Sequence, residues 1–108
     1  MYGGLRYNSD IPLVYALSVA PSATSTTAGR RITFTGVGSS ATGPVEYRFA
    51  IMRQESGQWS LVHDYQTANA VDWIAPGPGT YVAQLWVRRR GSSAAYESYV
   101  NGVPVTVR

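Results

Sequence analysis

One β-strand dominates the pattern of this sequence, and it runs through Pro78-Gly-Thr-Tyr-Val-Ala-Gln-Leu-Trp-Val-Arg88. The preceding residues 76–79 predict a tight turn, because proline lacks an amide proton and glycine tolerates turn dihedrals. After the turn the strand places Trp86 between Gln84 and Arg88 on a mixed face. Its other face is wholly apolar, which predicts a central strand lying on a core. The apolar positions are Tyr81, Ala83, Leu85 and Val87.

Working outward from this strand, apolar alternation recurs between turn signals and predicts about seven short strands. A pattern of this kind without any helical period is typical of an all-β protein, here a single antiparallel β-sandwich. The expected strands cover residues 13–20, 31–35, 45–52, 59–63, 69–74, 78–88 and 94–107, the last with a bulge or turn at Asn101-Gly102.

The large core side chains are expected to come from several of these strands. Alternation turns Ile32 and Phe34 inward on the second strand, and Val71 and Trp73 inward on the fifth. The third strand should contribute an inward face of Val45, Tyr47, Phe49 and Ile51. Tyr81 follows a turn at a position where sandwiches often use a tyrosine hydroxyl to hold a loop to the backbone.

Length and charge limit the functional classes. The chain has 108 residues, enough for one domain, with no cysteine for disulfides or thiolate metal sites. Its net charge is +3, and all nine basic residues are arginines. Arginine without lysine fits either an interface or a GC-rich genome. The charge is too small to predict specific binding of nucleic acid.

Residues 1–12 lack periodicity and predict an N-terminal arm, followed by a domain over residues 13–108. The arm carries Tyr2, Leu5, Arg6 and Tyr7 among small residues. It lacks the basic leader and long apolar run of a signal peptide or membrane span, so no membrane insertion is expected. We expect a chain made without export, or else a piece cut from a longer secreted protein.

Several motifs resemble bacterial immunoglobulin-like modules of the triple-tyrosine and PKD-like kind. They are Val45-Glu-Tyr-Arg-Phe49, Trp59, Pro78-Gly-Thr-Tyr81, Leu85-Trp-Val-Arg88 and Ala95-Tyr-Glu-Ser-Tyr99. The match spans about residues 14–107, nearly the whole domain. The resemblance implies an immunoglobulin-like fold and a non-catalytic spacer, sensing or adhesion role in surface and secreted proteins. Similar sandwiches also decorate phage capsids and tails.

No enzyme or cofactor is predicted. His63-Asp64 is the single histidine–carboxylate pair, and no Gly-x-Ser-x-Gly accompanies it. The aspartates are scattered without metal-ligand spacing, although calcium at a loop remains open. The run Arg88–Arg90 predicts either an anion contact or a solvated hairpin end that keeps an edge from pairing.

The face around Trp86 is the candidate interface. The third and sixth strands are expected to be neighbours, so Arg48 and Met52 should share an outer face with Gln84, Trp86 and Arg88. Aromatic, Met and Arg side chains are enriched in interface cores. Alternatively, Trp86 is covered by the arm or stacks under Arg48 as a cation–π pair.

We therefore expect a non-catalytic module that attaches to a larger protein assembly through the arm and the Trp86 face. The expected partner is a capsid, tail or surface lattice, or further copies of the chain, with a location on a virion or cell surface. A phage decoration protein is the first interpretation. The alternative is an excised immunoglobulin-like repeat of a secreted bacterial protein that binds carbohydrate or another surface ligand.

Overall fold

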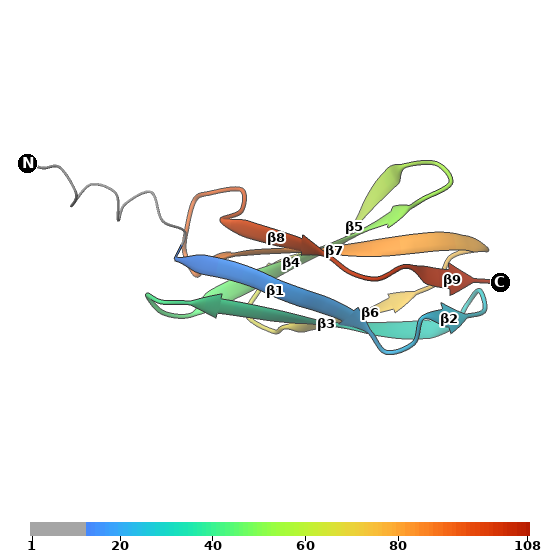
Figure 1. Ribbon diagram of the computed structural model, residues 1–108, viewed down its shortest axis with the longest axis horizontal. Coiled ribbons are helices and arrows are strands. Elements are labelled where there is room, and N and C mark those ends of the chain that lie inside the picture. Colours follow the sequence, from blue (N-terminus) through green and yellow to red (C-terminus); the bar gives the residue numbers. More distant parts are fainter. Residues whose placement is uncertain (1–12) are drawn as a thin grey trace, which may run out of the picture.

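The computed structural model describes residues 13–108, and within that range it contains nine β-strands and no helix. The strands form two sheets packed face to face, so the expected all-β sandwich is confirmed (Figure 1). None of the described residues belongs to a helix long and apolar enough to cross a membrane. The predicted arm residues Tyr2, Leu5, Arg6 and Tyr7 lie outside the described residues.

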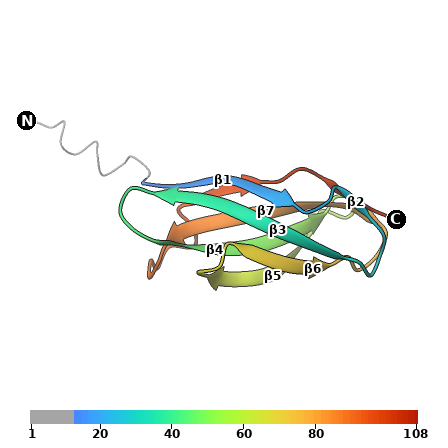
Figure 2. The same cartoon turned by 90° about the horizontal axis from the view of Figure 1, so that it is seen from below.

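The smaller sheet has three antiparallel strands in the order β1 (Val14–Pro21), β3 (Arg31–Ser40) and β6 (Ala70–Ile74). The larger sheet runs β2 (Ser25–Thr26), β9 (Val105–Val107), β7 (Gly79–Arg89), β4 (Val45–Arg53) and β5 (Gln58–Gln66), and β8 (Ser98–Asn101) also pairs with β7. Figure 2 shows the smaller sheet in front of the larger one. The pair β2–β9 is parallel, so the larger sheet is mixed.

The strand β7 occupies the centre of the larger sheet, as its alternation predicts. It pairs with β4 along one edge, and with β8 and β9 in succession along the other. All four predicted inward residues are buried, and Leu85 and Val87 are fully inaccessible. Val82 on the opposite face is also buried, which the alternation does not predict.

Three aromatic rings from three strands join the two sheets. Trp73 lies between Phe34, at a centroid distance of 5.9 Å, and Tyr81, at 5.0 Å. The Tyr81 hydroxyl donates to the Gly77 carbonyl at 2.9 Å, so the predicted tie between tyrosine and loop is confirmed. Phe49 and Ile51 are buried as expected, whereas Val45 and Tyr47 are only partly buried at the margin of the core.

Several strand boundaries differ from the prediction. The strand expected at residues 31–35 continues to Ser40 as β3, and the strand expected at residues 59–63 continues to Gln66 as β5. The loop expected before Arg31 contains the short strand β2, and the strand expected from Ala94 begins only at Ser98. Two carbonyls before β8 bond instead to side chains: Arg88 donates to the Ala94 carbonyl and Tyr65 donates to the Ala95 carbonyl. These bonds replace a strand ladder, and they hold the segment against the end of β7.

The first strand does not alternate through its whole length. Its pairing with β3 shifts register between Ala16 and Ser18, and its buried residues are Val14 and Val19. Because side chains in a strand alternate with a period of two, one extra residue exchanges the faces. The bulge therefore exposes Tyr15 and Leu17, which sequence alternation alone cannot assign.

Close packing of the two sheets depends on Gly36 of β3. A Cβ atom at this position would lie 2.8 Å from Leu85 Cδ2 and 3.1 Å from Leu85 Cδ1, and the Leu85 side chain is fully buried. The alanine side chain would therefore force the sheets apart or strain the Leu85 rotamer.

We expect Gly36→Ala to lower the free energy of unfolding by about 1–3 kcal/mol, the usual cost of overpacking a core. Gly77→Ala is the matched control, because a Cβ there meets nothing within 4 Å. Urea melts of both variants measure the difference. Equal stability of the two variants would show that the sheets are not closely packed at Gly36.

Candidate functional site

The outer face of the larger sheet carries the predicted interface residues. The strands β4 and β7 pair so that Arg48 lies opposite Trp86 and Met52 lies opposite Val82. Gln84 lies opposite Ala50 in the same ladder. The expected neighbourhood of the third and sixth predicted strands is therefore confirmed, and Arg48, Gln84 and Trp86 are brought together.

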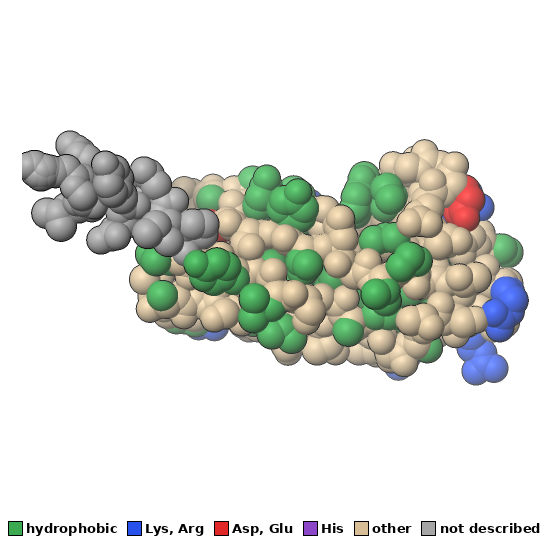
Figure 3. Space-filling view, viewed as in Figure 1, with side chains coloured by type: hydrophobic (Ala, Val, Ile, Leu, Met, Phe, Trp, Pro, Cys, Tyr) green, Lys and Arg blue, Asp and Glu red, His purple; other side chains and the backbone are tan. Residues whose placement is uncertain are grey.

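These residues form the floor of a groove of about 520 Å³, which we call the aromatic groove. One wall rises from β5, where Trp59 is 45% exposed and Leu61 is 52% exposed. Figure 3 shows hydrophobic side chains on both sides of a notch between the β4–β5 hairpin and the segment that carries β8. The described residues that line the groove are Arg48, Ala50, Trp59, Ser60, Leu61, Gln84 and Trp86.

A smaller hollow of about 160 Å³ continues the groove towards β8, and Gln84 and Trp86 line both. Its far side is formed by Tyr96 and Tyr99, which are 44% and 52% exposed. Trp86 and Tyr96 pack against each other at a centroid distance of 4.8 Å with their rings tilted by 51°, and Tyr96 meets Tyr99 edge-on at 5.5 Å. The two hollows therefore form one elongated surface that is lined with aromatic rings.

Hydrogen bonds and a cation–π contact fix the floor of the groove. The Arg48 guanidinium lies 4.5 Å from the Trp86 ring centroid, and its Nε is 3.3 Å from a carboxylate oxygen of Asp64. The Trp86 indole N–H donates to Gln84 Oε1 at 2.6 Å. Gln84 Nε2 in turn donates to Asn101 Oδ1 at 2.9 Å. The cation–π pair expected as one alternative for Trp86 is therefore present.

Beside the groove, Arg88 belongs to a separate cluster. Its Nε donates to a carboxylate oxygen of Glu46, and its guanidinium lies 3.8 Å from the ring centroid of Tyr65. Burial raises the pKa of the Tyr65 hydroxyl to about 12, so this group stays a neutral donor to the Ala95 carbonyl. The cluster braces residues 94–97, the segment that carries the groove residue Tyr96.

Arg89, the next arginine of the run, pairs with the carboxylate of Glu97. Arg89 donates its backbone N–H to Glu97 Oε1 at 2.7 Å, and its guanidinium bonds to the second oxygen at 3.2 Å. The backbone bond lowers the pKa of the Glu97 carboxyl. Two of the three consecutive arginines thus neutralise carboxylates of the domain itself, and neither supplies a free positive charge.

Several groove residues are missing from the sequence-based set. The sequence pattern predicts a strand at Trp59 but no site, and it does not connect Tyr96 or Tyr99 with the Trp86 face. The spacing of Tyr96 and Tyr99 in the motif Ala95-Tyr-Glu-Ser-Tyr99 is a sequence signal for these two residues. The sequence pattern does not predict that this motif folds beside Trp86. Met52 lies on the predicted face, but it is not among the residues that line the groove.

The residues considered for catalysis, His63 and Asp64, make contacts with their immediate neighbours and with Arg48. His63 Nδ1 lies 2.7 Å from the backbone oxygen of Asp64, while the Asp64 carboxylate accepts the Tyr65 N–H and faces Arg48. Among the described residues, no three His, Asp or Glu side chains gather where they could hold a metal ion.

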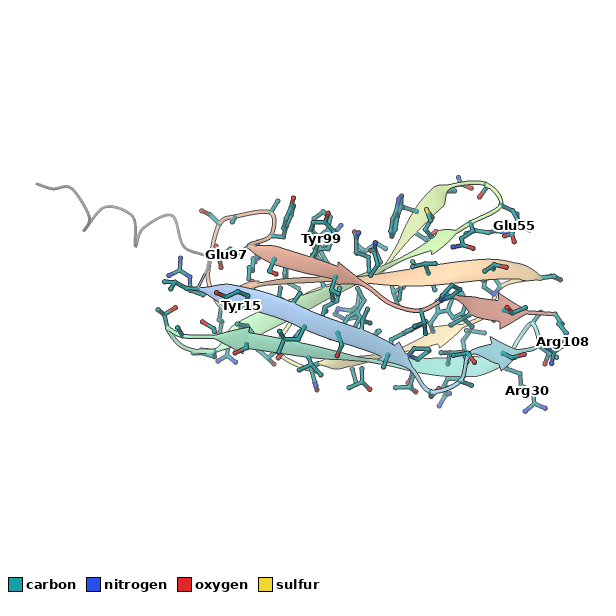
Figure 4. The ribbon with its side chains drawn as sticks, in the orientation of Figure 1. Tyr15, Arg30, Glu55, Glu97, Tyr99 and Arg108 are labelled. Atoms are coloured by element: carbon teal, nitrogen blue, oxygen red, sulfur yellow. The ribbon has the colours of Figure 1, made fainter. Side chains whose placement is uncertain are left out.

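A second apolar surface lies on the outer face of the smaller sheet. Tyr15 and Leu17 of β1 are 47% and 56% exposed, and Val37 of the neighbouring β3 is 46% exposed. Leu13, just before β1, is 40% exposed. We call these four residues the β1 stripe. Figure 4 labels Tyr15 on β1, and it shows Tyr99 rising from the other sheet.

Comparison with known proteins assigns no family. No protein-family model matches the chain, and no curated protein matches it. The resemblance to immunoglobulin-like modules therefore remains a sequence-based interpretation, and the functional argument depends on the surfaces described above.

The ion pair between Arg88 and Glu46 should contribute to stability, because the side chains are only 22% and 14% exposed. Glu46→Ala leaves a shielded guanidinium without its carboxylate, and we expect a loss of about 1–3 kcal/mol in the free energy of unfolding. Arg31→Ala is the control, because the Arg31–Asp72 pair is 3.9 Å long and mostly exposed. Chemical denaturation measures both, and equal losses would contradict the assignment.

Acid should loosen the contact that holds residues 94–97. Because the folded-state pKa of Glu97 is lowered, its ionised form stabilises the fold above the unfolded pKa of about 4.3. This contribution is lost as the pH falls through the lower, folded-state value. We expect Glu97→Gln to be less stable than the parent at neutral pH, with the difference shrinking in urea melts at pH 3. A difference that is constant with pH would exclude this role.

Proposed function

We propose that the chain is a non-catalytic immunoglobulin-like module that attaches to a larger protein assembly. The assembly is a capsid, tail or surface lattice, or an array of copies of the chain itself, and a phage decoration protein is the first interpretation. The observation that carries the proposal is the β1 stripe, an exposed apolar surface directly after residues 1–12 in the chain.

The strand order supports the immunoglobulin-like part of the proposal. In immunoglobulin domains the strands called C, F and G adjoin in one sheet, and variable domains extend that sheet beyond C. The larger sheet here has the corresponding order β9-β7-β4-β5, and the smaller sheet pairs the first strand with the third. Modules with this architecture act through their surfaces, so function is argued from the exposed side chains.

The β1 stripe suits attachment to a protein surface. Leu13, Tyr15, Leu17 and Val37 stand on the outside of one sheet and are each 40–56% exposed. Fully burying an apolar side chain of this size contributes roughly 1.5–3 kcal/mol, so covering the exposed half of each contributes about half as much. The apolar side chains of residues 1–12 adjoin the stripe in sequence, so the two can belong to one interface.

The Trp86 face, which the sequence suggested for attachment, suits a different kind of partner. The Trp86 ring lies between the Arg48 guanidinium and Tyr96, on the floor of a groove. A floor between two walls is accessible to a narrow ligand, whereas a broad protein surface would contact only the walls. We therefore place attachment on the β1 stripe and on residues 1–12.

The test uses the full chain with a C-terminal epitope tag, expressed in the organism from which it comes. Particles purified from that organism are separated on density gradients, and the tagged chain is detected in each fraction. We expect the parent to migrate with intact particles. The double variant Tyr15→Ser/Leu17→Ser should lower the particle-bound fraction at least about tenfold, because more than 1.4 kcal/mol of apolar contact is removed. Deletion of residues 1–12 should have the same direction of effect.

Trp59→Ala is the control for this experiment, because it removes an equally exposed aromatic side chain from the opposite face. It should leave particle binding unchanged. A parent chain that stays at the top of the gradient contradicts the proposal, and so does a double variant that migrates like the parent. Thermal melts of every variant confirm that the domain is folded.

A further inference from the structure

We propose that the aromatic groove is a binding site for a neutral oligosaccharide. This inference goes beyond attachment to an assembly, because it concerns the outer face of the larger sheet and not the β1 stripe. It depends on the shape of the groove, on the fixed polar groups of its floor, and on the balance of charge around it.

The shape fits a ligand a few sugar rings long. The groove of about 520 Å³ lies within the range of ordinary small-molecule sites, and the hollow of about 160 Å³ extends it past Trp86. Aromatic rings stand on both sides, with Trp59 on β5 and Tyr99 on β8. Sugar rings present C–H groups on their faces, and such groups make favourable weak contacts with aromatic rings.

The floor supplies planar polar groups that are held in place before any ligand binds. Gln84 bridges the Trp86 indole and the Asn101 side chain, and Arg48 is fixed between Trp86 and Asp64. Each of these groups uses only part of its hydrogen-bonding capacity, since an amide has two N–H donors and a guanidinium has five. The unused donors and acceptors match hydroxyl groups, which both donate and accept, and fixed groups lose little entropy on binding.

The charges favour a neutral ligand over an anionic one. Arg48 is the one charged residue among the described residues that line the groove, and Asp64 neutralises it at 3.3 Å. The nearby Arg88 and Arg89 are paired with Glu46 and Glu97. Acidic glycans and nucleic acids would meet no free positive charge here, and both depend on such charges.

A proline-rich peptide is the main competing occupant, since such segments dock into aromatic-lined grooves. Its backbone offers carbonyl acceptors and few donors. The second lone pair of Gln84 Oε1, which already accepts from the Trp86 indole, would then find no donor. A saccharide satisfies both kinds of group, so we commit to the saccharide and make the peptide an outcome of the test.

The experiment applies the full chain to an array of neutral and acidic glycans, followed by isothermal titration with the strongest neutral oligosaccharide. We expect retention on neutral glycans, with an affinity that changes less than about twofold between about 50 mM and about 500 mM NaCl. Trp59→Ala and Tyr99→Ala should each weaken binding about tenfold or more, because each removes one aromatic wall of the groove.

The double variant Tyr15→Ser/Leu17→Ser is the matched control, and it should bind the oligosaccharide as the parent does. Absence of binding to every neutral glycan overturns the inference. Binding only to acidic glycans, or full affinity in Trp59→Ala, also overturns it. Decaproline is titrated as the proline-rich peptide probe, and tighter binding of decaproline than of any sugar overturns the inference in the same way. None of these results changes the particle-gradient experiment, so failure of the saccharide inference and failure of the attachment proposal are distinguishable.

Discussion

The pairing of β4 with β7 is the constraint on which the other features of this domain depend. The two strands pair continuously from Val45 opposite Arg89 to Arg53 opposite Tyr81. Because side chains alternate along each strand, this single register decides both faces at once. It sends Phe49 and Leu85 into the core, and it places Arg48 across from Trp86 on the outside. A shift of one residue would bury the groove and expose the core.

The groove combines a rigid floor with few uncompensated charges. Arg48, Gln84 and the Trp86 indole are each bonded to a neighbouring side chain, so the folding energy of the sheet also fixes the positions of these groups. The arginines beside the groove make bonds within the domain. Arg88 donates to Glu46 and to the Ala94 carbonyl, and Arg89 donates to Glu97, so both stabilise the segment that carries Tyr96. An arginine-rich composition therefore does not by itself indicate a basic binding surface.

The sequence predicts the central features of the fold well and the candidate site only in part. Strict alternation identified the buried face of β7, and the turn before Tyr81 identified its hydroxyl bond, since both signals are local. Local patterns could not show the bulge in β1, which depends on pairing with β3. Local patterns also could not predict that Trp59 and Tyr99 line one groove. The strands that carry them, β5 and β8, are connected in the sheet only by their pairing with β4 and β7.

The two walls of the groove differ in how their strands are paired in the sheet. The strand β8 is paired with the central strand, whereas β5 is the last strand of its sheet, and its ladder with β4 is interrupted around Phe49. Figure 1 shows the β4–β5 hairpin rising out of the plane of the sheet. The spacing between the walls is therefore governed by one short hairpin at the margin. A change in that hairpin would therefore alter the width of the groove, while the core and the floor of the groove remain the same.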